Sequence, residues 1–163
     1  MEDWAIFATV AGAAAASLTG LLFVAVSIRI DVIAPSPELR NRAAQILLLF
    51  GTVVFISIAL AIPAQAYGPL GAEVILVGVL AAFGMLALDR RARAGIEASG
   101  AQTIGRTLDV IAPNAVTSVL VLVSGVVIAA GVHAGLYILV LPVVTALAGG
   151  VASAWLLLTR IET

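Results

Sequence analysis

The fold of this chain is decided by residues 110–159, which read VIAPNAVTSVLVLVSGVVIAAGVHAGLYILVLPVVTALAGGVASAWLLLT. This stretch contains no Asp, Glu, Lys or Arg and a single histidine, His133. A helix crosses a hydrocarbon core of about 30 Å with roughly 20 apolar residues, so the stretch is too long for a single crossing. Residues 133–135, His-Ala-Gly, therefore predict a tight turn between two membrane-spanning helices.

The composition of the whole chain predicts the same environment. Of its 163 residues, 63% are hydrophobic and 10% are charged, and the mean hydropathy is +1.21. Soluble domains are typically about 45–50% apolar and about 25% charged, so this chain has too few charges to cover a soluble fold. Apolar runs of spanning length predict an all-α integral membrane protein, because a helix satisfies its own backbone hydrogen bonds in lipid.

Five apolar stretches predict a helical bundle with five transmembrane helices, forming a single transmembrane domain over 1–163. They are residues 5–28, 43–66, 74–88, 114–132 and 136–159, and none contains Asp, Glu, Lys or Arg. The connections carry local signals. Residues 68–71, Gly-Pro-Leu-Gly, predict a turn beside the boundary residue Glu73, and the polar residues 95–105 predict a flexible loop. Ser36 followed by Pro37 predicts a helix N-cap with proline at the first helical position.

The basic residues predict the orientation. All eight are arginine, and every one falls in a connection or terminus of the same side: Arg29, Arg40, Arg42, Arg90, Arg91, Arg93, Arg106 and Arg160. By the positive-inside rule this side is cytoplasmic, which places the N-terminus outside and the C-terminus in the cytoplasm. Arginine without lysine in an alanine-rich chain is typical of a bacterial gene, so we expect a multi-pass protein of the bacterial cytoplasmic (inner) membrane.

Small residues along the first predicted helix suggest a close contact or a path. Gly12, Ala16 and Gly20 recur every fourth residue, which lets two helices approach closely in lipid. A face of small or weakly polar residues overlaps this repeat: Thr9, Ala13, Ala16, Gly20 and Ser27. This face either lines a narrow path in an oligomer or is a helix-packing seam whose hydroxyls bond to the preceding turn. The seam is the more common use of such a motif.

Two further sets of residues have a functional and a structural interpretation. Asn114, Ser118 and Gly125 form a weaker stripe on the fourth predicted helix, which is again pore-facing or helix-packing. The arginines Arg40, Arg42, Arg90, Arg91 and Arg93 lie where anionic lipid headgroups or an acidic partner would meet them. The structural interpretation of these arginines is that they only set the topology.

The sequence lacks the usual constellations for chemistry. Cysteine is absent, and a single histidine is a poor basis for a metal site, which generally needs three or four ligands. No ionisable residue lies inside a predicted span, whereas intramembrane catalysis or proton coupling usually requires one. We therefore expect no enzyme activity, no metal and no cofactor, and the net charge of −1 predicts no nucleic-acid partner.

Both ends of the chain resemble small bacterial multi-pass membrane proteins, some of which carry the label of modulator of the membrane protease FtsH. The resemblance rests on GLLFVAVS (20–27), GLYILVLP (135–142) and AWLLL (154–158). It implies a multi-helix membrane fold and assigns no site residue.

The function expected from these observations is that of a small channel or passive permeation protein. Short helices with little mass outside the bilayer form a pore most readily by symmetric assembly, so we expect a homo-oligomer in the lipid bilayer. The alternative is a non-transporting regulator or assembly partner that docks on another membrane protein through the same small-residue faces.

Overall fold

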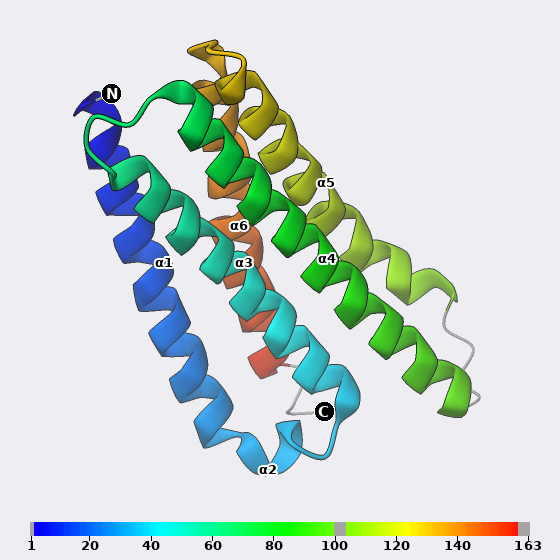
Figure 1. Ribbon diagram of the computed structural model, residues 1–163. Helices are drawn as coiled ribbons and strands as arrows, with labels where there is room; N and C mark the ends of the chain where they lie inside the picture. The colour runs from blue at the N-terminus through cyan, green and yellow to red at the C-terminus, as the bar shows by residue number, and fades with distance from the viewer. Residues whose placement is uncertain (1, 100–103, 160–163) are drawn as a thin grey trace.

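The computed structural model is a bundle of long helices that run back and forth between two ends (Figure 1). It describes residues 2–99 and 104–159, with side chains described at 4–37, 39–91 and 116–155. The helices are α1 (Glu2–Ile28), the short α2 (Ile30–Ile33), α3 (Pro37–Ala61), α4 (Tyr67–Ser99), α5 (Ile104–Ala129) and α6 (Ala134–Thr159). No strand occurs in these ranges, as the sequence predicts.

Four helices are long and apolar enough to cross a membrane: Trp4–Ile28, Leu39–Ala61, Tyr67–Arg91 and Ala134–Trp155. In α5 the apolar stretch Val116–Ala129 is shorter. The chain is thus an all-helical protein with four candidate membrane-spanning helices, which agrees with the predicted class of a helical membrane bundle.

Several predicted boundaries are wrong. The second predicted span, 43–66, ends in the structure at Ala61, and residues 62–66 form the connection to α4. The third span begins at residue 67 rather than 74, because residues 68–71 form the first turn of α4 instead of a separate turn. Helix α4 continues to Ser99 and α5 begins at Ile104, so every residue of the predicted loop 95–105 that the structure describes is helical. The rest of that loop lies outside the described residues.

The turn between α5 and α6 also differs slightly from the prediction. Helix α5 ends at Ala129 rather than residue 132, and α6 begins at Ala134, so the reversal uses residues 130–133. Gly131 has φ +77°, a conformation in the left-handed region that glycine adopts without steric cost. The N-cap prediction is confirmed: the Ser36 side chain accepts a hydrogen bond from the backbone N–H of Leu39 (3.4 Å), and Pro37 opens α3.

Helix α3 holds the bundle together, since it packs against α1, α4 and α6, while α5 packs between α4 and α6. Large apolar side chains fill the space among the helices, including Phe50, Ile56, Leu70, Ile128 and Leu139, each less than 2% exposed. By contrast, α1 touches α6 only lightly. The protomer therefore has a filled centre and one helix, α1, at its margin.

Helices α4 and α5 approach most closely at glycines. A Cβ atom built on Gly71 would lie 2.5 Å from Cα of Ala129, and one built on Gly125 would lie 2.9 Å from the backbone nitrogen of Ile75. Glycine has only a hydrogen atom as its side chain, and any larger residue at these positions would prevent the two backbones from packing at this distance. Residues that the sequence alone suggests as a turn thus include a helix-crossing point, Gly71.

Candidate functional site

The buried face of α1 consists of small residues. Ala8, Ala11 and Ala15 are buried in the same apolar cluster as Val53 and Ile56 of α3. Small side chains let the two helix backbones approach closely, so this face is the seam that joins α1 to the bundle. It differs from the predicted repeat of Gly12, Ala16 and Gly20.

The predicted face of α1 lies mostly on the outside of the protomer. Only Gly12 faces α3, where an added Cβ would lie 3.0 Å from Cβ of Ser57. The other members of the predicted set are exposed, and no atom lies within 4 Å of a Cβ built on Gly20. We call these exposed residues the docking face: Thr9, Ala13, Ala16, Gly20 and Ser27. No helix among the described residues covers it.

The threonine hydroxyls of α1 are directed to the helix itself. Thr9 Oγ1 donates a hydrogen bond to the carbonyl oxygen of Ala5 (2.8 Å), and Thr19 Oγ1 donates to that of Ala15 (2.8 Å). A hydroxyl bonded to the preceding turn needs no water or further donor in lipid. Between Thr9 and Ser27 the docking face therefore presents only Ala13, Ala16 and Gly20, which are apolar.

The weaker stripe on α5 is inside the protomer where it is described. Ser118 is buried, and Gly125 faces Val74 and Ile75 of α4. Asn114, the third member, lies outside the residues whose side chains are described. The two described positions thus take part in packing within one chain.

The arginines gather at one end of the bundle, which we call the arginine end. Arg40, Arg90 and Arg91 are exposed there, and Arg42 is half-buried. Arg93 lies outside the residues whose side chains are described. Because Arg40 lies in the first turn of α3 and Arg90 and Arg91 are the last residues of the candidate span in α4, the exposed guanidinium groups lie where a bilayer surface would meet them.

A buried polar pair at the arginine end was missed by the sequence analysis. Gln45 is only 7% exposed, and its Nε2 donates a hydrogen bond to Oδ1 of Asp89 (2.9 Å), which joins α3 to α4. The two residues are 44 positions apart, and no local pattern links them. A hydrogen bond to a carboxylate is stronger than one between neutral groups, so the pair fixes how these two helices meet.

Removal of the Asp89 carboxylate should destabilise the protein, because the buried Gln45 amide then has no hydrogen-bond acceptor. We expect Asp89→Ala to lower the free energy of unfolding by about 1–3 kcal/mol, because the Gln45 amide keeps its buried position and loses its acceptor. Thermal unfolding in detergent measures the change, and Arg90→Ala on the exposed side is the matched control. The double variant Gln45→Leu/Asp89→Ala should recover part of the loss. Equal stability of Asp89→Ala and Arg90→Ala would contradict the prediction.

Aromatic residues cluster at the opposite end, where the chain begins. Trp4 packs edge-on against Phe7 and Tyr137, with ring centroids 5.7 and 5.1 Å away. The Tyr67 hydroxyl lies 2.8 Å from Nδ1 of His133. These contacts join α1 to α6, and the start of α4 to the turn before α6. Tryptophan and tyrosine favour the level of the lipid headgroups, so this cluster suits a membrane interface.

The candidate span Tyr67–Arg91 is longer than the predicted one and includes ionisable residues, which the sequence predicts to lie outside the spans: Glu73 near one end and Asp89, Arg90 and Arg91 at the other. Because α4 begins at Tyr67, the candidate span Tyr67–Arg91 includes Glu73 in its second turn. Its Oε2 and the Oε1 of Gln65 are buried without a hydrogen-bond partner among the described residues. Only six residues, about 9 Å of helix, separate Glu73 from the start of α4, which places the carboxyl group near the end of the span. Among the described residues, no group of three or more His, Asp or Glu side chains is placed to hold a metal ion.

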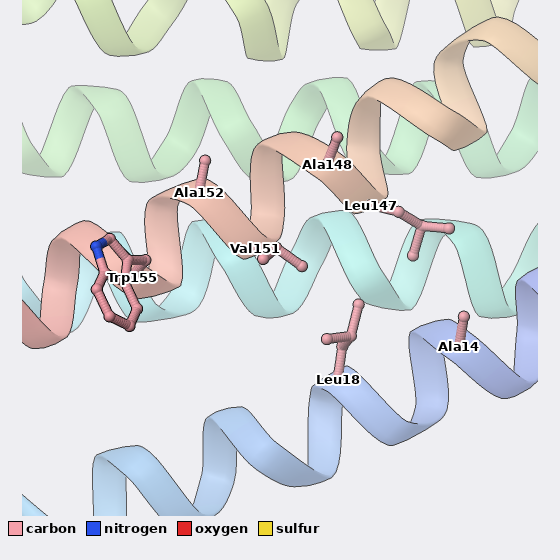
Figure 2. Close-up of a pocket in the computed structure, with 7 residues that line it drawn as sticks. All are labelled: Ala14, Leu18, Leu147, Ala148, Val151, Ala152 and Trp155. Carbon is pink, nitrogen blue, oxygen red and sulfur yellow. The ribbon is translucent and has the colours of Figure 1, made fainter.

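A groove separates α1 from α6 toward the arginine end (Figure 2). It is a shallow, open groove of about 820 Å³, lined by apolar side chains of both helices: Ala14, Leu18, Leu147, Ala148, Val151, Ala152 and Trp155. In Figure 2, Leu18 points from α1 toward α6, and Trp155 lies at one end of the row. No sequence pattern predicts this groove, because its walls are ordinary apolar residues and the groove depends on how α1 and α6 are placed relative to each other.

Comparison of the chain with known protein families, with curated proteins and with solved structures finds no match.

Proposed function

We propose that this protein crosses the membrane five times and forms a homo-oligomer. We further propose that it acts as a regulator or assembly partner of another membrane protein, and that α1 supplies the surface for these contacts within the bilayer. The fifth span is α5, whose 26 residues reach about 39 Å. The orientation that the arginines favour places the arginine end in the cytoplasm and the N-terminus outside, in a bacterial cytoplasmic membrane.

One observation carries the docking proposal: the exposed docking face is small, and its middle is apolar. Ala13, Ala16 and Gly20 let another helix approach closely, and helices in lipid associate through such close packing rather than through a hydrophobic drive. The Thr9 hydroxyl already bonds to its own helix, so this part of the face needs no water. This supports a packing surface over the lining of a water-filled path.

Cross-linking tests the docking face directly, because the chain has no cysteine of its own. We expect Ala16→Cys to form covalent dimers in membranes under oxidising conditions. Leu21→Cys, on an exposed part of α1 outside the docking face, is the control and should remain monomeric. Adding Gly20→Leu to Ala16→Cys should prevent the cross-link. Equal cross-linking at positions 16 and 21 would overturn the assignment of the docking face.

The same variants test for a second membrane protein. A specific partner should co-purify with the parent chain and be lost with Ala16→Leu, which changes only an exposed position. The resemblance to proteins labelled modulator of FtsH protease makes that protease the first candidate to look for. A partner retained equally by the variant binds elsewhere on the chain.

A small channel is the second candidate function. The packed centre of the protomer leaves no room for a path within one chain. Large side chains such as Phe50, Ile56 and Leu139 occupy the centre of the bundle, so a path would lie between protomers along α1. Ion flux through liposomes that contain the purified oligomer tests this. Flux that Ala16→Leu abolishes would favour the channel, whereas tight vesicles with folded oligomer would favour docking alone.

A further inference from the structure

The groove between α1 and α6 extends through only part of the bundle. Its α6 wall runs from Leu147 to Trp155, nine residues that rise about 12 Å along the helix, and Trp155 ends the candidate span. Toward the other end the two helices are joined, since the rings of Trp4 and Tyr137 are in contact with centroids 5.1 Å apart. The groove therefore lies toward the arginine end and does not continue to the opposite end of the bundle, where α1 and α6 are in contact.

We propose that this groove holds one acyl chain of an anionic phospholipid from the leaflet at the arginine end. A hydrocarbon core of about 30 Å gives each leaflet about 15 Å, which is close to the length of the groove. A membrane-spanning helix of a second protein would need a groove through both leaflets. At the opposite end of the bundle the contact between Trp4 and Tyr137 closes the space between α1 and α6, so no such continuous groove exists.

The lining of the groove fits hydrocarbon. Ala14 and Leu18 form one wall and the α6 residues form the other, with no polar atom except the indole nitrogen of Trp155. Because Leu147 packs against the buried cluster of Leu22, Ile46 and Phe50, the floor of the groove is also apolar. Water in such a site would find few hydrogen-bond partners, whereas an acyl chain gains contact with the apolar side chains of both helices.

The segment of residues 29–42, which follows α1 at the arginine end of the groove, supplies positive charge for the lipid headgroup. Arg29 directly follows α1, and the connection from residue 29 to 42 holds three arginines against two acids, Asp31 and Glu38. Arg40, in the first turn of α3, is exposed. Guanidinium groups bind phosphate oxygens in a bidentate manner, so an anionic phospholipid with its tail in the groove has its headgroup beside these residues.

Native mass spectrometry of the full-length protein in detergent tests the site. We expect the parent protein to retain one phospholipid per protomer, preferring phosphatidylglycerol over phosphatidylcholine when both are supplied. Ala152→Phe, which fills the groove, should lower the fraction of protomers that retain this lipid at least tenfold. Ser153→Phe, at the exposed neighbouring position outside the groove, is the matched control and should retain it. Ala148→Phe is a second groove variant, in case Ala152→Phe disturbs the fold.

Tryptophan fluorescence gives an independent readout, because the chain has only Trp4 and Trp155. In a Trp4→Phe background, phosphatidylglycerol with brominated acyl chains should quench Trp155 with saturation near one lipid per protomer, and Ala152→Phe should abolish the saturable part. Equal lipid retention by Ala152→Phe and Ser153→Phe would overturn the proposal. Loss of lipid through Arg40→Ala with retained docking-face cross-linking would support it, and separates this site from the function proposed above.

Discussion

Gly71→Ala is expected to destabilise the folded protein by about 1–3 kcal/mol, the typical cost of forcing extra atoms into a packed core. The new Cβ would lie 2.5 Å from Cα and 2.6 Å from Cβ of Ala129. Because the first of these atoms is backbone, no rotamer change relieves the overlap, and α4 and α5 must move apart. Thermal unfolding in detergent, followed by circular dichroism, measures the loss.

Two glycines of the same helix provide a graded control. Nothing lies within 4 Å of a Cβ built on Gly68, so Gly68→Ala should be neutral or stabilise by at most about 1 kcal/mol through helix propensity. A Cβ on Gly78 would meet Leu122 at 2.9 Å, but the atom is the end of a flexible side chain. Gly78→Ala should therefore cost less than Gly71→Ala. An equal response of all three positions would show that the α4 to α5 crossing is not as close as described.

Gly150→Ala is the second change with a large expected effect, again about 1–3 kcal/mol. Its Cβ would run into the ring of Phe50, with Cζ at 2.7 Å. That ring is 1% exposed and packs with Leu22 and Ile46, so it has no space into which to turn. The neighbouring Gly149→Ala meets nothing within 4 Å and should be neutral or stabilising by up to about 1 kcal/mol.

A double variant identifies Phe50 as the cause. Phe50→Leu alone removes ring atoms from a buried cluster and should destabilise the protein. In combination with Gly150→Ala, the added methyl group occupies part of the vacated space, so the two losses should sum to less than their separate values. Strict additivity would mean that Gly150 acts through helix propensity or the backbone rather than through Phe50.

The small residues of this chain show which helix contacts a sequence can predict and which it cannot. The spacing of Gly12, Ala16 and Gly20 predicts a contact face, yet the seam between α1 and α3 uses Ala8, Ala11 and Ala15. In a segment such as AGAAAASLTG, small residues occur on every side of the helix, so the pattern does not select one of them. Gly71 shows the converse: residues 68–71 resemble a turn, but the structure places them in a helix at a close crossing.

The polar residues also fall into two groups: those whose role a local pattern predicts, and those whose role depends on another segment of the chain. Ser36 acts on a backbone N–H three residues away, so a local pattern predicts its role. Gln45 and Asp89 meet across two helices, and Glu73 falls inside a span because α4 begins earlier than hydropathy indicates. Each of these depends on where another segment begins or lies.

The sequence by itself determined that this protein is helical and built for a membrane, because composition and the length of apolar runs are properties of the chain that need no partner. It also determined the segregation of every arginine to one side of the predicted topology. The tertiary structure alone decided which face of α1 is buried, which glycines allow close crossings, and that α1 and α6 leave an apolar groove between them. In lipid, apolar side chains have no preference for the interior over the surroundings, so only the fit between particular helices selects the faces that meet.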